Sequence, residues 1–288
     1  MTAVAHTTTA TTATTTVTTG QDDGGPALRV RVLGLLEATR AGRSVLPTAA
    51  KPRQVFALLA LRVGEVVPVA ALVEELWGER RPPSARTTLQ TYIKQLRKLI
   101  GPGAAGVLAT RYGGYLLDLP AEAVDVHDYE RLARSGRRAA EAGDAESAAR
   151  LLRSALEAWR GPALVDVPTG ESLAIELTRL EESRLSVVEA RIDAEMRCGR
   201  HSLLLSELAA LTARYPMNEN LCAQHMLALF RSGRQWQALD AYQGLRAKLS
   251  EELGVSPSRR VRELQHAILT ADARLDQAQA GHLQRLLV

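Results

Sequence analysis

Residues 84–100 read SARTTLQTYIKQLRKLI, and this stretch decides the fold of the N-terminal half. Its apolar residues recur at the spacing i, i+4, i+7, i+11 of one helix face: Leu89, Ile93, Leu96 and Ile100. A polar and cationic stripe repeats that spacing two positions earlier: Thr87, Thr91, Lys94 and Lys98. Because two residues turn a helix by about 200°, the second stripe should face away from the first. The pattern predicts a helix anchored on one side and open to solvent on the other.

This outward face has two interpretations. Hydroxyl, amide and ammonium groups on an anchored helix can read the major groove of DNA, and Gln90 and Gln95 border the stripe. An ordinary solvated helix face has a similar composition, so the helix alone does not separate the two. The flanking segments favour the DNA interpretation.

The segments on either side predict a winged helix-turn-helix. Residues 28–34, LRVRVLG, alternate apolar and polar as a half-buried strand does, and a weak second strand follows through residues 45–46. Residues 51–63 and 68–77 predict two helices, each followed by glycine, and Ser84 fits the N-cap of the third. Residues 107–119, VLATRYGGYLLDL, predict a hairpin with Arg111 and Tyr112 at its tip. In such folds the last helix enters the major groove, and a wing arginine can enter the minor groove.

The remainder of the chain reads as helix. The turns at Gly199 and Gly233 are 34 residues apart, with RCGRHSLLLSEL (197–208) aligned over RSGRQWQALDAY (231–242), and Gly143 opens a third similar turn. A helix–turn–helix period of about 34 residues is that of tetratricopeptide repeats. We expect the large aromatic residues here to fill the packing between helices: Trp159, Phe230, Trp236 and Tyr242.

The predicted fold class is therefore mainly α, with an N-terminal winged helix-turn-helix (α+β) followed by an all-α tetratricopeptide-like repeat domain. The expected divisions are a disordered Thr/Ala-rich tail (1–27), the winged helix (28–120), the repeat domain (121–272) and a C-terminal tail (273–288). Residues 28–120 hold 14 Lys/Arg against 6 Asp/Glu, whereas residues 121–288 hold 22 against 24. A basic first half suggests that this half meets a polyanion.

The sequence shows no pattern for catalysis, metal or cofactor binding. The two cysteines, Cys198 and Cys222, lie in helical patterns and have no metal-site spacing. His127 lies between Asp125 and Asp128, which we interpret as a capping-type helix start rather than a metal site. No secretory signal or membrane-spanning apolar run occurs, so we expect a cytoplasmic, nucleoid-associated protein that contacts no membrane.

With both halves placed, the chain resembles the Streptomyces antibiotic regulatory protein family of actinobacterial activators. Members join an OmpR-type winged helix to a bacterial transcriptional activation domain of tetratricopeptide-like helices. The resemblance rests on seven segments in order: RVLGLLEA (31–38), VPVAALVEELWGERRPPSA (67–85), LQTYIKQLRKLI (89–100), RYGGYLL (111–117), RLEESRLSVVEARIDAEMRCGRH (179–201), MLALFRSGRQWQALDAY (226–242) and LSEELGVSPS (249–258).

The resemblance implies binding to direct repeats upstream of biosynthetic promoters and recruitment of RNA polymerase holoenzyme, without a catalytic site. The loop after the second helix, with Glu79, Arg80 and Arg81, would meet polymerase. OmpR-type helices often carry arginine where this chain has Lys94 and Gln95, and Gln95 cannot neutralise a phosphate. The ATP-binding module of the long members is not matched, because no G-x-x-x-x-G-K-[ST] motif occurs, so we predict no nucleotide dependence.

We therefore predict a sequence-specific activator of an antibiotic or secondary-metabolite gene cluster that self-associates on double-stranded promoter DNA. Its predicted DNA contacts, from the residue pattern and the resemblance together, are Arg86, Thr87, Gln90, Thr91, Tyr92, Lys94, Gln95, Lys98, Arg111 and Tyr112. The alternative is a helical-repeat adaptor that binds proteins or peptides and uses its winged helix for protein contacts. An adaptor should not prefer the promoters of its own cluster over random duplex DNA.

Overall fold

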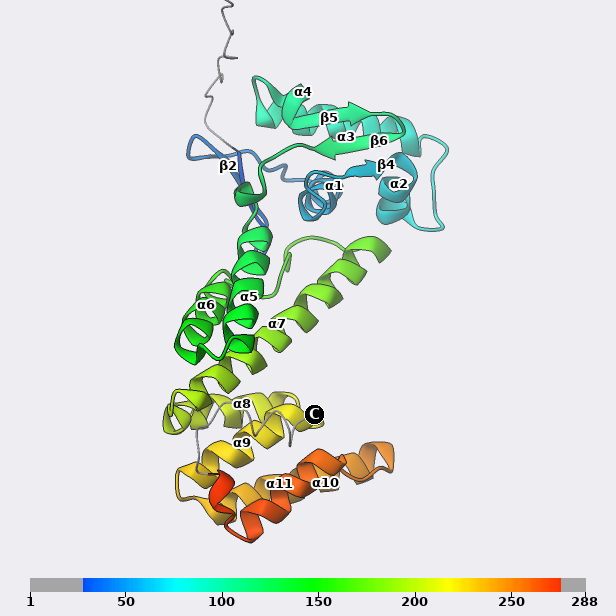
Figure 1. Cartoon of the computed structure of the whole chain (residues 1–288). Helices are drawn as coiled ribbons and strands as arrows, with labels where there is room; N and C mark the ends of the chain where they lie inside the picture. The colour runs from blue at the N-terminus through cyan, green and yellow to red at the C-terminus, as the bar shows by residue number, and fades with distance from the viewer. Residues whose placement is uncertain (1–27, 276–288) are drawn as a thin grey trace, which may run out of the picture.

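A computed structural model of the chain describes residues 28–275 (Figure 1). Three strands come first, β1 (Arg29–Arg31), β2 (Glu37–Arg40) and β3 (Arg43–Ser44), and they form an antiparallel sheet in that order. The next elements are α1 (Ala50–Leu61), β4 (Val66–Pro68), α2 (Val69–Trp77), α3 (Ala85–Ile100), α4 (Ala104–Val107), β5 (Leu108–Arg111) and β6 (Gly114–Leu117). This is the predicted winged helix-turn-helix, with β5 and β6 as the wing.

The differences from the predicted elements are small and local. Strand β4 is too short for an alternation of apolar and polar residues to be recognised in the sequence. It forms because Val67 pairs with Tyr115 of β6, and the resulting sheet has the order β4-β6-β5. Pro68 therefore ends β4 and is the N-cap of α2 instead of its first residue. Ser84 is the N-cap residue of α3, as predicted, but its side chain makes no capping hydrogen bond.

The second part consists of helices and short 3₁₀ turns. Its elements are η1 (Ala121–Ala123), α5 (Asp125–Glu141), α6 (Ala145–Glu157), α7 (Glu171–Arg197), η2 (His201–Leu204), α8 (Leu205–Arg214), α9 (Glu219–Arg231), α10 (Gln235–Leu253), α11 (Arg259–Leu269) and η3 (Ala273–Leu275). At 1.5 Å per residue, the 27 residues of α7 span about 40 Å. Figure 1 shows α7 running from beneath the winged helix to the layer of α8 and α9.

The predicted repeat turns have one common geometry. Gly143, Gly199 and Gly233 adopt φ of 82°, 75° and 72°. The residue after each glycine donates its N–H to the carbonyl five residues earlier, at 2.9–3.0 Å: Asp144 to Ala139, Arg200 to Glu195, and Arg234 to Leu229. This is the Schellman closure of a helix, which needs a left-handed residue. The helical-repeat prediction is confirmed.

A fourth turn of the same kind has no glycine. Ala271 adopts φ 47°, and Asp272 donates its N–H to Ala267 O at 2.9 Å. An L-residue with a Cβ rarely takes this conformation, so a search for glycine does not find the turn. The repeat therefore continues through α11 to η3.

The buried residues form two hydrophobic clusters. The first runs from Leu28 to Ala194 and joins the winged helix to α5, α6 and most of α7. The second runs from Ile192 to Leu275 and joins the end of α7 to α8–α11. Helix α7 thus contributes residues to both clusters. The first cluster continues past residue 120, where the sequence predicts a domain boundary, and that boundary stays a prediction.

Two interpretations of individual residues are wrong. Asp125 starts α5, as predicted, but it does not cap the helix, whose N-cap is Val124; its carboxylate accepts the N–H groups of Val32 at 2.8 Å and Leu33 at 3.2 Å. Trp159 and Tyr242 are buried as expected, but Trp236 is 70% exposed and fills no helix interface.

The predicted disordered tail (1–27) and residues 276–288 of the predicted C-terminal tail lie outside the described residues. No helix within residues 28–275 combines the length and the apolar character of a membrane span.

Candidate nucleic-acid interface

The outward face of α3 is exposed along its whole length. The apolar stripe behind it is almost fully buried, with Leu89 at 0%, Ile93 at 2% and Leu96 at 1% exposure. The exposed polar residues of α3 are Arg86, Thr87, Gln90, Thr91, Lys94, Gln95 and Lys98, and no acidic residue occurs in the helix. The predicted geometry of two opposed stripes is therefore confirmed, and the helices of the second part do not cover the polar one.

Tyr92 differs from its predicted neighbours because it is half-buried. Its ring stacks on Trp77 of α2, with centroids 6.5 Å apart and planes at 17°. The Lys51 ammonium lies 4.6 Å from the centroid of the Trp77 ring and donates to Leu76 O at 3.2 Å. The Tyr92 ring is therefore engaged in packing that holds α3 against α2.

The wing is tied directly to α3 by Arg97, a residue absent from the predicted set. Its Nε donates to Leu108 O at 2.9 Å, and its Nη2 donates to Thr110 Oγ1 at 2.8 Å. No feature of the sequence separates this arginine from the neighbouring lysines; its role depends on where β5 lies. Arg40 of β2 likewise donates to Ile100 O at 2.9 Å and Pro102 O at 2.6 Å, which holds the C-terminus of α3.

The tip of the wing presents Arg111 and Tyr112 to solvent. Tyr112 has a relative exposure of 105%, and the Arg111 side chain is 50% exposed with Asp118 at 4.0 Å. Figure 1 shows the β5–β6 hairpin beside α3, at the end of the molecule farthest from α10 and α11. The two elements predicted to contact DNA, α3 and the wing, are therefore neighbours at one end of the molecule.

The loop between α2 and α3 holds the residues assigned to polymerase. Glu79 and Arg80 are exposed. Arg81 forms an ion pair with Glu74 and donates its Nε to Gly78 O at 3.0 Å. The side chain of Arg81 therefore shapes the loop, whereas that of Arg80 makes no hydrogen bond or ion pair among the described residues and is available to a partner.

A buried carboxylate joins the winged helix to α7. Glu75 of α2 is 3% exposed. It accepts the N–H of Gly170 at 2.6 Å, the N–H of Leu173 at 3.1 Å and the Gln54 Nε2 group at 2.9 Å. The first N–H groups of a helix have no hydrogen-bond acceptor within that helix. The Glu75 carboxylate, which belongs to α2, supplies this acceptor and so caps the N-terminus of α7. The contact sets the position of α3 relative to the repeat helices.

Among residues 28–275, no group of three or more His, Cys, Asp or Glu side chains has the geometry of a metal site. Burial raises the pKa of the Cys222 thiol to about 12, with a smaller contribution from Glu219. This thiol is therefore protonated at neutral pH and is a packing residue rather than a nucleophile.

We expect Arg97→Ala to weaken DNA binding by freeing the wing from α3. Loss of two hydrogen bonds should also cost about 1–2 kcal/mol of stability, measured by urea unfolding. Arg97→Lys keeps the charge but lacks the planar fork that reaches both Leu108 and Thr110. If the lysine variant binds DNA as the native chain does, Arg97 acts through its charge and the positioning role is wrong.

Comparison with known proteins agrees with this architecture. Residues 43–117 match the family described as transcriptional regulatory protein, C terminal, and residues 124–269 match the bacterial transcriptional activator domain. Regulatory protein DnrI of Streptomyces peucetius is 55% identical over 258 residues, which cover 86% of this chain and 94% of DnrI. Regulatory protein AfsR of Streptomyces coelicolor is 41% identical over 256 residues, covering 88% of this chain but 25% of AfsR.

The structure of Mycobacterium tuberculosis EmbR in complex with a low-affinity phosphopeptide is also similar, with a TM-score of 0.84 and 34% identity. The match covers 91% of this chain and 69% of that chain. The order of the two matched families is that of the predicted domains, and DnrI, which is matched over 94% of its length, is a regulatory protein. The chain belongs to the Streptomyces antibiotic regulatory protein family of transcriptional activators.

Proposed function

We propose that this chain activates transcription of a biosynthetic gene cluster by binding direct repeats in promoter DNA and recruiting RNA polymerase holoenzyme. The observation that carries the proposal is the exposed, acid-free face of α3 beside the wing tip. Lys94 and Lys98 would neutralise phosphates, and Gln90, Thr91 and Gln95 would contact base edges. Arg86 and Thr87 would contact the backbone at the start of the helix, and Arg111 and Tyr112 would approach the minor groove.

The proposed role of Tyr92 changes with the structure. Its ring packs on Trp77, so we assign it to positioning α3, with no base contact through the ring. Gln95 is exposed but uncharged, so its proposed contact is to a base edge.

A single α3 reads too few base pairs to select one site in a genome. Two protomers in tandem, on repeats one helical turn of DNA apart, would lie on the same face of the duplex. The repeat helices would then connect the protomers or reach polymerase. In this proposal the protein acts by binding alone and catalyses no reaction.

The polymerase contact is proposed for the loop after α2, and Arg80 is its best candidate. We expect Arg80→Glu to abolish activation in a reporter assay while leaving promoter affinity within about twofold, because surface substitutions change stability little. Arg81→Glu is the less informative variant, because it would place a second carboxylate beside that of Glu74. Simultaneous loss of DNA binding in Arg80→Glu would refute a separate polymerase role.

The proposal is tested by footprinting and gel shifts of the purified chain on the promoters of its neighbouring genes. We expect protection of repeated sites and a Kd of roughly 10⁻⁸–10⁻¹¹ M at ~150 mM salt. Equal affinity for these promoters and for random duplex DNA would favour the adaptor alternative and would contradict the proposal.

A further inference from the structure

A pocket of about 980 Å³ lies between α7, α9 and α11, far along α7 from the winged helix. Its apolar lining comes from Ala190, Met196, Ala223, Leu227, Leu264 and Leu275. This volume is at the upper end of pockets that enclose small organic molecules, which are apolar with a few polar groups that orient the ligand. The DNA-binding function proposed above makes no use of it.

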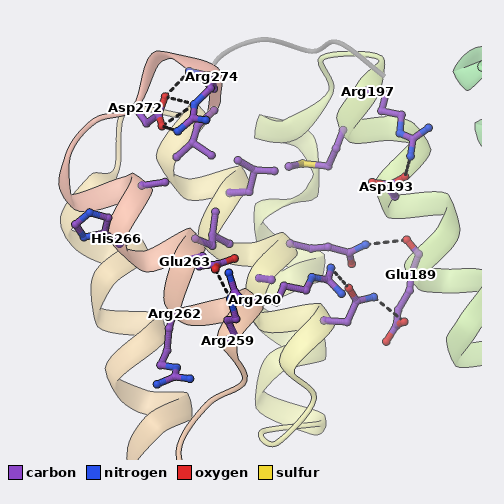
Figure 2. Close-up of a pocket in the computed structure, with 18 of the residues that line it drawn as sticks. Glu189, Asp193, Arg197, Arg259, Arg260, Arg262, Glu263, His266, Asp272 and Arg274 are labelled. Atoms are coloured by element: carbon purple, nitrogen blue, oxygen red, sulfur yellow. Dashed lines mark hydrogen bonds and ion pairs between the residues drawn. The ribbon is translucent and has the colours of Figure 1, made fainter. Parts of the chain in front are cut away.

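The carboxylates around this pocket already have partners. Asp193 pairs with Arg197 at 2.7 Å, Glu263 pairs with Arg259 at 2.6 Å, and Asp272 pairs with Arg274. Glu189 accepts the side-chain amides of Asn218 at 2.9 Å and Asn220 at 2.7 Å. Figure 2 shows the three ion pairs around the pocket. Asp193, Glu263 and Asp272 therefore have arginine partners within the protein, and the Glu189 carboxylate is held by neutral amides.

Like Arg262, Arg260 lines the pocket without an ion-pair partner among the described residues. Among the described residues no carboxylate lies within ion-pair distance of it; its Nη2 donates to Asn220 Oδ1 at 2.7 Å, and its buried Nε has no partner. Burial lowers the pKa of this guanidinium, while Glu189, Asp193 and Glu219 act in the opposite direction from farther away. In Figure 2 its side chain is directed from α11 toward Glu189 of α7, whereas Arg262 points away. A half-buried guanidinium with unused donors favours a planar anionic acceptor.

We propose that this pocket binds a small organic carboxylate with an apolar or aromatic body, whose carboxylate pairs with Arg260. The apolar lining would enclose the body of the molecule. Because Arg262 is directed away, the Arg260 guanidinium is left to pair with one carboxylate, which it matches in charge and shape, whereas a phosphate dianion would call for more than one cation. The site is separate from α3 and the wing, so it can be tested without DNA.

The test uses the full chain and the fluorescent aromatic anion 8-anilinonaphthalene-1-sulfonate. Bound probe is displaced with naphthalene-2-carboxylate or with its neutral counterpart, naphthalene-2-carboxamide. We expect the carboxylate to act at an about tenfold lower concentration than the amide, because a charge-assisted hydrogen bond is worth about that factor. Arg260→Gln should remove this difference, and Arg260→Lys should keep part of it.

Two further variants guard against misfolding and non-specific binding. Ala267→Trp places a large ring in the pocket and should prevent displaceable probe binding. Arg246→Gln is the matched control, because Arg246 lies exposed on α10 and is not among the residues that line the pocket. It should behave as the native chain, and circular dichroism should be unchanged in every variant.

Three results would overturn the proposal. The first is equal displacement by carboxylate and carboxamide on the native chain. The second is a carboxylate preference that survives in Arg260→Gln. The third is binding that appears only after residues 276–288 are removed, which would assign the pocket to that segment of the chain rather than to a small molecule.

Discussion

Replacing Lys94 and Lys98 together by alanine is expected to lower affinity for the target promoter on the order of 10- to 100-fold at ~150 mM salt. Both ammonium groups project from the exposed face of α3, and the structure shows no carboxylate in that helix to neutralise them. Each lost phosphate contact should also reduce the slope of log Kobs against log salt by about 1, because fewer counterions are released on binding. Gel shifts at several salt concentrations measure both quantities.

The matched control is Lys248→Ala. The Lys248 side chain is also exposed, at 48%, but lies on α10 beside Glu251 and Glu252. We expect its removal to leave the slope unchanged. A double variant of α3 that binds with native affinity and native salt dependence would show that α3 is not the recognition helix.

Replacing Glu75 by alanine is expected to destabilise the native state by about 3 kcal/mol. The substitution leaves the N–H groups of Gly170 and Leu173 without a partner at the start of α7, and it removes one acceptor of the Gln54 amide. Each buried group left unpaired costs about 1–3 kcal/mol, and loss of a helix cap costs a similar amount. For a cooperative unit of this size the melting temperature should fall by about 6–12 °C, measured by calorimetry.

Gly170→Ala tests the same contact from the other side. A Cβ on Gly170 would lie 2.2 Å from Glu75 O, so α7 would have to move away from α2. Glu79→Ala, in the exposed loop that follows α2, is the control and should change stability by no more than about 0.5 kcal/mol. Native stability in both Glu75→Ala and Gly170→Ala would mean that the α2–α7 contact does not hold the two parts together.

Patterns that repeat along the chain could be read without coordinates. The opposed stripes of α3, the Gly-Gly hairpin and the 34-residue spacing of Gly199 and Gly233 each depend on neighbours within one helix, turn or repeat. Local periodicity encodes which face of an element is buried, and that information is complete in the sequence. The winged helix, the helical repeats and the exposed face of α3 were predictable for this reason.

Contacts between distant elements could not be read in this way. In the sequence, Arg97 cannot be distinguished from other basic residues near the stripe; only the folded chain places Leu108 of β5 beside it. Glu75 likewise has the character of a surface acid in the sequence, and only the fold brings it to the start of α7. Asp125 holds Val32, just after β1, across 93 residues of sequence, and Arg260 gains its significance from a pocket shared by three helices. A polar side chain takes its role from the unpaired group it meets, and that group is set by the packing of the folded chain.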